Sequence, residues 1–533
     1  MRGAKGTTIL AIIIVALAGS MTVSAATRCE ELAGLKLAGT TITSAQEVAA
    51  GAFVSPAPEA PGASPAAAFK DLPAFCRVTA EIKPAKDSEI KMEMWMPISG
   101  WTGRYEGVGN GGFAGSITYL GLAGALRQGS VAASTDTGHI GTPVDASWAL
   151  GHPDKITDFG YRAVHEMTIK AKALIKAFYG DAPRHSYFAG CSNGGRQALM
   201  EAQRFPEDYD GIVAGAPAHH FTHLLSGAVY DGQATMNDPG SYIPASKIPA
   251  ISAAVLAACD SQDGVKDGLV SDPSKCAFDP ATLVCKEGQA EGASANSCLS
   301  AAQAAALKKI YAGPKTSKGE QVRPGFPPGG EEGPGGWGLW ITGPAPGRAL
   351  LFAFANGFFK NMVFDDPNWD IKSANLDAVV KAADDKQAHN LNATDPNLKA
   401  FKARGGKLIL YHGWSDPAIP AQGTIDYYNK VADAGSFARL FLAPGMQHCF
   451  GGPGPSAFGQ FERSATANDP QRNVYVAIEQ WVEKGTAPER LIATQAGNST
   501  VKMSRPLCPY PQVAKYKGKG EIKDEANWTC GNR

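Results

Sequence analysis

The stretch that decides the fold reads His185-Ser-Tyr-Phe-Ala-Gly-Cys-Ser-Asn-Gly-Gly-Arg-Gln-Ala198. Its first residues, 185–189, form an apolar run typical of a buried strand, and residues 195–204 have a helix-like pattern. Between them, residues 190–194 match the motif G-x-S-x-G, in which the serine occupies a sharp turn from a strand to a helix. The small residues let this turn pack tightly. We therefore predict that the hydroxyl group of Ser192 is exposed at the carboxyl end of the strand.

A serine becomes a nucleophile when a histidine accepts its proton and an acidic side chain orients that histidine. In α/β-hydrolases the acid and then the histidine follow the serine along the chain. Asp416 lies in a turn after one apolar run, and His448 lies in a loop after the next. These positions predict a Ser192–His448–Asp416 catalytic triad, with an ordinary serine in a glycine-rich turn as the alternative. His412 is expected near the site as a substrate or oxyanion neighbour, or as a structural residue at a strand end.

The segments around the motif alternate between strand and helix patterns. This alternation favours a mostly parallel sheet with helical crossovers, so we predict an α/β fold with an α/β-hydrolase core. The expected strands are 75–97 (half-buried antiparallel strands), 129–135, 185–190, 211–215, 407–411 and 439–442, and the expected helices are 158–179, 195–204 and 474–483.

The alternation stops after about His220 and returns near Lys407. Residues 259–298 hold four cysteines, and residues 313–347 are dense in glycine and proline. So long a segment without structure of its own is uncommon inside a compact domain, so we expect one α/β domain interrupted by an insertion of roughly 180 residues. The predicted organisation is a signal peptide (1–25), the first part of the core (26–220), the insertion (221–402), which the resemblance described below implies is a lid domain, and the second part of the core (403–533).

Composition narrows the class of protein. The chain has 533 residues, with 50 Lys and Arg against 50 Asp and Glu, and a formal net charge of +0. Because nucleic-acid binding relies on an excess of positive charge, we expect no nucleic-acid partner. The 44% hydrophobic and 19% charged fractions are typical of a folded globular protein and exclude a disordered one.

The amino terminus resembles a secretory signal peptide. Arg2 and Lys5 precede an apolar run at 9–18, and small residues follow at 23–26, as in a signal that is cleaved after export. The alternative is a membrane anchor, but this run is too short to cross a hydrocarbon core of ~30 Å. We therefore expect a secreted or periplasmic protein without a membrane anchor after cleavage, in an environment that favours disulfides.

Two of the ten cysteines directly adjoin the proposed nucleophile and base. Cys191 precedes Ser192, and Cys449 follows His448. If the serine and histidine lie within hydrogen-bonding distance, the two cysteines must also be close enough for a disulfide that would hold the two loops together. The alternative is that both are unrelated small core residues.

With these residues in place, the chain resembles the tannase/feruloyl esterase family. The resemblance rests on Gly190-Cys-Ser-Asn-Gly-Gly-Arg-Gln-Ala198, on Asp416 and His448-Cys449, and on the segments 203–211 and 134–139. It covers nearly the whole mature chain. It implies an α/β-hydrolase core with a large lid, and a disulfide between the residues that flank the triad. The family includes tannases, feruloyl esterases and mono(2-hydroxyethyl) terephthalate hydrolase.

An oxyanion hole needs two N–H donors. The N–H group of Asn193 follows the nucleophile, and an early loop with the sequence Asn110-Gly111-Gly112 is the candidate for the second. The resemblance points to the same loop without choosing between Gly111 and Gly112. The alternative is a structural glycine turn.

A second candidate site is an acidic loop, Asp260-Ser-Gln-Asp-Gly-Val-Lys-Asp-Gly-Leu269. Calcium prefers several carboxylate and carbonyl oxygens on a tightly curved loop, although the spacing is not that of an EF-hand. The resemblance implies a structural Ca²⁺ in the lid, and the alternative is a solvated acidic turn. The implied ligands are the side chains of Asp260, Asp263 and Asp267 and the carbonyl groups of Val265 and Leu269.

The remaining cysteines do not fix their own connectivity. Proximity in the sequence favours one set of pairs, which also resembles the family pattern. Those pairs are Cys29–Cys76, Cys259–Cys276, Cys285–Cys298 and Cys508–Cys530.

Together these features predict a secreted serine carboxylesterase that hydrolyses aromatic (phenolic) acid esters, such as feruloyl or galloyl esters, without an organic cofactor. Aromatic residues between 337 and 369 are candidates to stack on a phenolic ring, although most are expected to form the lid core. Arg348 is considered as a partner for a substrate carboxylate or phenolate, but the resemblance does not align it firmly. The alternatives are a terephthalate monoester hydrolase of the same family, a serine peptidase and a non-catalytic binding protein.

Overall fold

The computed structural model of the chain describes residues 1, 3, 27–56, 65–287, 296–460, 468–496 and 501–533. The expected signal peptide, residues 1–25, lies outside the described residues except at positions 1 and 3. Within the described ranges, none of the helices combines the length and the apolar character needed to span a bilayer.

The described residues form a central nine-stranded sheet with the order β1-β2-β3-β5-β4-β6-β7-β8-β9. Strands β1, β2 and β3 are antiparallel neighbours, and β3 runs antiparallel to β5. From β5 to β9 all neighbouring pairs are parallel, which confirms the predicted mostly parallel sheet. The strands are β1 (Thr40–Val48), β2 (Phe75–Ile82), β3 (Ile90–Pro97), β4 (Arg104–Val108), β5 (Val131–Thr135), β6 (His185–Cys191), β7 (Gly211–Gly215), β8 (Lys407–Gly413) and β9 (Ala438–Ala443).

Helices cover both faces of this sheet. Along β8, Leu408 and Leu410 pack into a core shared with α4 and α5, whereas Ile409 and Tyr411 pack into a core shared with α15. The two-residue period of a strand causes this alternation, and it explains why the parallel strands are apolar on both sides. The helices outside the inserted region are α1 (Pro65–Ala68), α2 (Tyr119–Arg127), α3 (Pro153–Thr157), α4 (Ala163–Tyr179), α5 (Asn193–Arg204), α13 (Ala421–Lys430), α14 (Ala434–Phe437) and α15 (Val474–Lys484).

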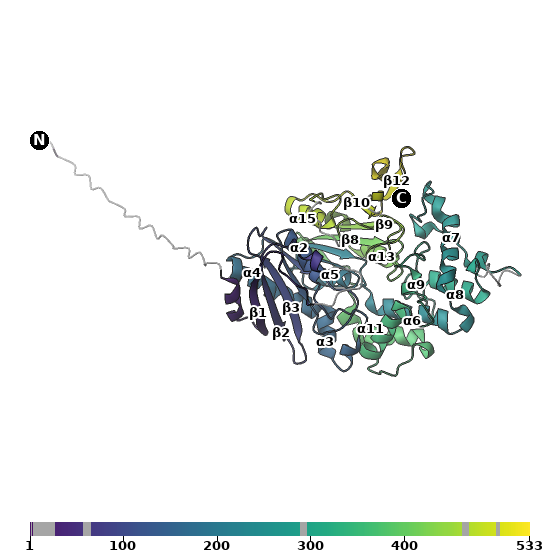
Figure 1. Cartoon of the computed structure of the whole chain (residues 1–533), viewed down its shortest axis with the longest axis horizontal. Coiled ribbons are helices and arrows are strands. Elements are labelled where there is room, and N and C mark those ends of the chain that lie inside the picture. The colour runs from purple at the N-terminus through teal and green to yellow at the C-terminus, as the bar shows by residue number, and fades with distance from the viewer. Residues whose placement is uncertain (2, 4–26, 57–64, 288–295, 461–467, 497–500) are drawn as a thin grey trace.

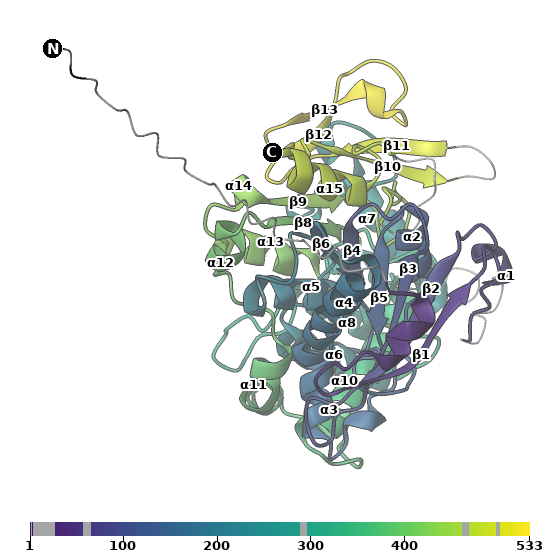
Figure 2. The same cartoon turned by 90° about the vertical axis from the view of Figure 1, so that its left-hand side faces the viewer.

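Between β7 and β8 the chain leaves the sheet and returns, yet these two strands pair directly. Residues 216–406, here called the inserted segment, supply most of a second hydrophobic core, to which residues before the segment, such as Phe113 and Phe159, also contribute. Figures 1 and 2 show most of its teal and green helices gathered beside the sheet, with the helix labelled α7 close to the yellow carboxyl-terminal strands. Its helices are α6 (Phe221–Met236), α7 (Ile248–Cys259), α8 (Ala301–Ala312), α9 (Trp337–Trp340), α10 (Leu350–Phe358), α11 (Leu376–Leu391) and α12 (Lys399–Ala403).

Two small antiparallel pairs complete the described chain, and the sequence patterns did not predict them. One joins β10 (Leu491–Ala496) to β11 (Val501–Leu507), and the other joins β12 (Val513–Tyr516) to β13 (Trp528–Gly531). A bridge between Phe441 and Pro509 connects this region to the edge of the main sheet.

Five disulfides are present in the described residues, and all five match the expected pairs. Four of them fasten segments close in sequence, whereas the fifth joins residues separated by 258 positions. The pairs are Cys29–Cys76, Cys191–Cys449, Cys259–Cys276, Cys285–Cys298 and Cys508–Cys530.

Candidate active site

Ser192 occupies the turn between β6 and α5. Its backbone has φ 65° and ψ −122°, a conformation that is costly for a residue with a side chain and that marks functional turns. The glycines around it permit a very close approach of backbones: a Cβ at Gly190 would lie 2.6 Å from the Gly194 carbonyl carbon, and one at Gly195 would lie 2.2 Å from the Gly215 oxygen. Glycine is therefore required at both positions for the turn to close.

Three side chains form a continuous hydrogen-bonded row. Oγ of Ser192 lies 2.9 Å from Nε2 of His448, and Nδ1 of His448 lies 2.9 Å from Oδ2 of Asp416. The three residues follow β6, β9 and β8, so the parallel strands deliver them to one edge of the sheet. When Nδ1 donates its proton to Asp416, Nε2 is free to accept the hydroxyl proton of Ser192.

Asp416 is held as a carboxylate although it is only 1% exposed. Burial by itself raises the pKa of a carboxyl group. The charge and hydrogen bond of His448, together with the hydrogen bond of His412, outweigh burial and hold the pKa of Asp416 well below its usual value. Oδ1 also accepts the N–H groups of Ala418 (2.8 Å) and Ile419 (3.0 Å). The ionised carboxylate can therefore stabilise a positive charge on His448.

His412 is not among the described residues that line the cavity, and its contacts favour the structural alternative at the strand end. It is fully buried, and its Nε2 lies 3.2 Å from Oδ2 of Asp416 and 2.9 Å from the carbonyl oxygen of Ile419. Its Nδ1 lies 2.8 Å from Oγ1 of Thr424 on α13. These contacts are those expected of a side chain that holds Asp416 in place.

The Cys191–Cys449 disulfide connects the two loops that carry Ser192 and His448. Its Cα atoms are 6.0 Å apart, and its cysteines are the immediate neighbours of those two residues. The bridge restricts relative movement of the loops, so it supports the short contact between the hydroxyl group and the imidazole.

The glycine loop after β4 faces the same turn. The N–H group of Asn110 donates to Oε1 of Gln197 on α5 (2.9 Å), and Nε2 of Gln197 donates back to the Asn110 side chain (3.2 Å). Gly112 has φ 55°, and a Cβ there would lie 2.2 Å from the Pro143 oxygen. Among the described residues there is no acceptor for the N–H groups of Gly111, Gly112 or Asn193. These groups are therefore available to a ligand.

A cavity of about 780 Å³ opens in front of Ser192 and His448, a size suited to a small organic ligand. The inserted segment forms its roof, where the ring of Trp340 lies 4.9 Å from the ring of His448 in an edge-to-face arrangement. Phe354 stacks against Trp340 at 6.3 Å. Within the described chain, the lining contains no Asp, Glu, Lys or Arg side chain, and Arg348 is exposed elsewhere. The cavity is therefore apolar and aromatic.

The cavity mouth carries exposed apolar side chains that the sequence patterns did not identify. Leu120 and Phe450 are each 64% exposed, and Val144 and Leu339 are each 42% exposed, and all four line the cavity. Large apolar side chains gathered on a surface mark binding sites more often than scattered ones do. Leu120 and Leu339 lie in α2 and α9, whereas Val144 and Phe450 lie in loops, so no single periodic segment could have revealed the group.

The acidic loop at 260–269 curves tightly at two glycines with positive φ, Gly264 and Gly268. Asp260 is buried and accepts the N–H groups of Asp267 (3.0 Å) and Gly268 (3.1 Å). Oδ1 of Asp263 accepts the N–H group of Val265 (2.9 Å). The carboxylates therefore point into the turn of their own loop.

The donor atoms of this loop fit a hard divalent cation in kind, because all of them are oxygens. The three carboxylates are not among the groups of described residues whose donor atoms all lie within 4.8 Å of one another. Asp267 instead forms a buried ion pair with Arg505 on β11. The loop thus offers suitable ligands, and one of them has a competing cationic partner.

The arrangement around Ser192 is suited to acyl transfer. It combines a hydroxyl group, an imidazole that can accept its proton, a carboxylate that orients the imidazole, and free N–H groups nearby. These four elements are what nucleophilic attack on a carbonyl carbon requires.

Comparisons with known proteins agree with this chemistry. The family model described as "Tannase and feruloyl esterase" matches residues 76–531. An uncharacterized esterase of Xanthomonas campestris pv. campestris is 43% identical over 96% of this chain and 92% of its own length. Feruloyl esterase B of Aspergillus niger is 34% identical over 94% of this chain and 95% of its own length. The crystal structure of feruloyl esterase B from Aspergillus oryzae has a TM-score of 0.86 and 31% identity, and the match covers 94% of this chain and 99% of that chain.

Proposed function

Because this chain belongs to the tannase and feruloyl esterase family and is a carboxylic ester hydrolase, we propose that it hydrolyses neutral esters of aromatic, phenolic acids through an acyl-enzyme on Ser192. The observation that carries the proposal is the continuous row Ser192–His448–Asp416 at the base of an uncharged, aromatic cavity.

In the proposed reaction, Oγ of Ser192 attacks the ester carbonyl carbon while Nε2 of His448 takes its proton. Asp416 stabilises the imidazolium that forms. The N–H group of Asn193 and an N–H group of Gly111 or Gly112 donate to the oxyanion of the tetrahedral intermediate. His448 then gives its proton to the leaving alkoxide, so the alcohol departs and the acyl group stays on Ser192. A water molecule, deprotonated by His448, releases the acid by the reverse sequence.

The inserted segment acts in this proposal as a lid that selects the acyl group. Trp340 and Phe354 present ring faces or edges on which a phenolic ring can pack. A monoester of a dicarboxylic acid carries a negative charge, and the described lining offers that charge no cationic partner. Because burying an unpaired carboxylate is costly, we expect neutral aromatic esters to be preferred over terephthalate monoesters. The apolar side chains at the mouth then favour a bulky, apolar leaving alcohol.

An activity panel with the full mature chain tests this proposal. We expect methyl ferulate and methyl gallate to be hydrolysed, a terephthalate monoester to be cleaved at least about tenfold more slowly, and a peptide anilide to be left intact. Ser192→Ala should remove turnover of all esters without changing the circular dichroism spectrum. Substantial activity in Ser192→Ala would contradict the nucleophile, and a preference for the charged monoester would contradict the substrate class.

We also propose that the acidic loop binds one structural Ca²⁺ through Asp260, Asp263, Asp267 and the carbonyl groups of Val265 and Leu269. The support is the all-oxygen donor set on a curved loop beside the Cys259–Cys276 disulfide. The ion would offset repulsion among the three carboxylates and plays no part in acyl transfer. Removing it with a chelator should lower the melting temperature, and added calcium should restore it. Unchanged melting in the presence of the chelator would contradict the site.

We also propose that the protein is exported into an oxidising compartment. Five disulfides are typical of proteins outside the reducing cytosol. Residues 1–25 have the pattern of a cleaved signal. Sequencing the amino terminus of the exported protein tests this, and a mature chain that still begins at Met1 would contradict it.

A further inference from the structure

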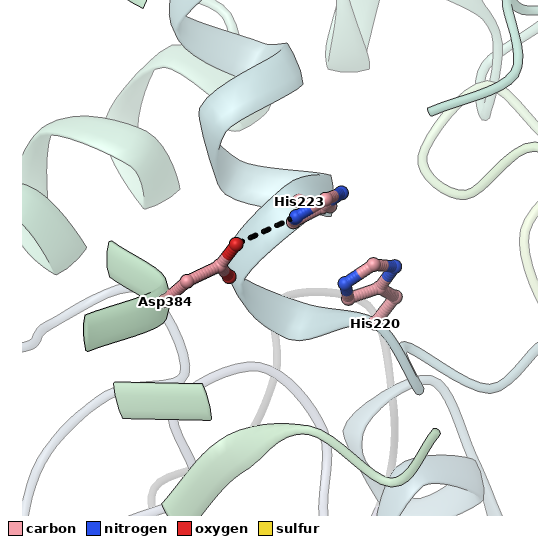
Figure 3. A group of neighbouring side chains, drawn as sticks. All are labelled: His220, His223 and Asp384. Carbon is pink, nitrogen blue, oxygen red and sulfur yellow. Dashed lines mark hydrogen bonds and ion pairs between the residues drawn. The ribbon is translucent and has the colours of Figure 1, made fainter. Parts of the chain in front are cut away.

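A second group of chemically active side chains lies outside the candidate active site, where α6 meets α11. His220 immediately precedes α6, His223 lies in the first turn of α6, and Asp384 lies on α11. Figure 3 shows the two imidazole rings side by side, with Asp384 approaching from the neighbouring helix. Each of the three residues offers one donor atom within 4.8 Å of the other two.

Hydrogen bonds orient two of these donors. Nδ1 of His223 lies 2.8 Å from the carbonyl oxygen of Val322, to which it donates, and Nε2 lies 2.9 Å from Oδ2 of Asp384. Oδ1 of Asp384 accepts the hydroxyl proton of Thr222 (2.6 Å). Metal-binding histidines and carboxylates are usually held by such outer hydrogen bonds, which fix the ring and leave one atom for the ion.

His220 is the least satisfied member of the group. Its ring stacks on the ring of His223 with centroids 3.7 Å apart and planes 19° apart. Among the described residues, no hydrogen-bond partner is found for either of its ring nitrogens. A neutral ring nitrogen carries a lone pair in the plane of its ring, so this half-buried imidazole can become a metal ligand once its ring turns out of the stack toward the ion held by His223 and Asp384.

The group borders a cavity of about 360 Å³, separate from the one in front of Ser192. His219, His220 and His223 all line it. Ala218, Leu224 and Ile419 line both cavities, so they form the wall between them. An ion held by the three residues would therefore have an open position facing a space that solvent or a small ligand can occupy.

We infer that His220, His223 and Asp384 bind one divalent transition-metal ion of the Zn²⁺ type. Two imidazole nitrogens and one carboxylate oxygen, with a fourth position open, are a common ligand set for zinc, whereas calcium prefers oxygen donors alone. Binding replaces the proton between Nε2 of His223 and Oδ2 of Asp384, and that proton goes to solvent. A plain His223–Asp384 ion pair is the alternative.

The remaining cluster of this kind in the described chain consists of His165, Glu201 and Asp208. It is more deeply buried, and its residues are not among those that line the described cavities. It thus lacks the open position that distinguishes the group at α6.

The test is metal binding by the full mature chain, stripped of metals and then kept in excess calcium so that the acidic loop does not compete. We expect isothermal titration with ZnCl₂ to give one site. Asp384→Asn and His223→Ala should weaken that site by about 100-fold or more, since even changes to outer partners cost 10–100-fold. His389→Ala, an exposed histidine of α11, is the matched control and should bind as the wild type does.

Two results would overturn the inference. One is that the wild type shows no stoichiometric site for zinc at micromolar concentration. The other is that Asp384→Asn and His223→Ala bind zinc as tightly as His389→Ala does. Because His223→Ala can disturb folding, the spectrum of bound Co²⁺ supplies a second readout. A tetrahedral spectrum in the wild type that persists in the nearly isosteric Asp384→Asn would equally contradict the site.

Discussion

The sheet and the inserted segment use different physical means to place their side chains. The sheet carries Ser192, Asp416 and His448 at the ends of parallel strands whose two faces are sealed by apolar helices. The inserted segment combines two helices of 16 residues, α6 and α11, with shorter helices and long turns. Buried polar pairs reinforce it, such as Arg323–Asp231 and the hydroxyl group of Tyr311 on Glu331.

This difference separates chemistry from recognition. The regular part fixes the distances between reacting atoms, and the irregular part supplies the roof of the cavity. A change in the row Ser192–His448–Asp416 should therefore reduce turnover, and a change in the inserted segment should alter stability or affinity. Substitutions at Asp416, Arg323 and Trp340 test that separation, and one at Asp136 tests a buried group of the sheet that affects stability alone.

The largest effect is expected at Asp416. Asp416→Asn keeps the shape of the side chain but removes the charge that stabilises the His448 cation, so kcat should fall about 10³- to 10⁴-fold with little change in KM. Steady-state hydrolysis of methyl ferulate measures this. Asp426→Asn, an exposed carboxylate of α13, is the control. A loss of less than about tenfold at Asp416 would contradict the assigned role.

The second effect belongs to the inserted segment. Arg323→Met leaves Asp231 buried without its partner, which should lower the free energy of unfolding by about 3–5 kcal/mol. Burial already raises the pKa of Asp231 to about 6, against the attraction of Arg323. Without Arg323 that pKa rises further, so the loss should grow as pH increases above 6. Urea unfolding at pH 5 and pH 8 measures it.

The double variant Arg323→Met/Asp231→Leu separates the ion pair from other causes. With both charges removed, most of the lost stability should return, because no unpaired charge remains buried. Stability as low as that of the single variant would show that the guanidinium acts through packing instead.

The third effect is a pH dependence of folding stability that arises in the sheet region. Asp136 is buried and lies directly after β5. Its Oδ1 atom accepts the N–H groups of Lys91 and Gly138. Its Oδ2 atom has no hydrogen-bond partner in the described chain. Burial raises its pKa to about 7. Since this folded-state pKa lies above the unfolded value, its contribution to stability is lost as pH rises from about 4 to about 7.

Because the side chain of Asp136→Asn does not titrate, the stability of this variant relative to the wild type should increase as pH rises. The difference in unfolding free energy between pH 5 and pH 8 should shift by about 2–3 kcal/mol in favour of the variant. Chemical unfolding at the two pH values measures the shift. Parallel stability curves for the two proteins would contradict an ionisation near neutral pH.

The smallest effect is expected at Trp340, in the part of the inserted segment that covers the cavity. Trp340→Ala removes a ring that borders the cavity beside His448, so KM for methyl ferulate should rise about tenfold, or ~1.4 kcal/mol, while kcat changes less. Ile140→Ala, an exposed apolar residue outside the cavity lining, is the control. A fall in kcat with unchanged KM would mean that the inserted segment takes part in the chemistry itself.

The predictable part of the molecule was the part governed by periodicity. The apolar runs located β6, β7, β8 and β9 to within two residues, and the glycine motif located the turn at Ser192. Strong local patterns and a fixed order of strands leave few alternative positions for these strands and for the turn. The same reasoning placed His448 and Asp416 at the same edge of the sheet.

The rest depended on contacts between distant segments. For His412, a substrate neighbour and a structural residue were both open from the sequence, and only its contacts with Asp416, Ile419 and Thr424 favour the second. Asp384 and His223 are 161 positions apart, and neither lies in a recognisable motif. The apolar mouth around Phe450 is likewise built from separate helices and loops. Such groupings are properties of the tertiary structure, and a single sequence carries no periodic signal for them.

The Cys191–Cys449 disulfide also determines what happens to the chain when a protease cuts its backbone. It closes a covalent ring that contains the whole inserted segment. A protease that cuts once at any point between Ser192 and His448 produces two pieces that stay joined beside both residues. Exposed turns of the inserted segment can thus be cut without releasing either half of the proton-transfer pair.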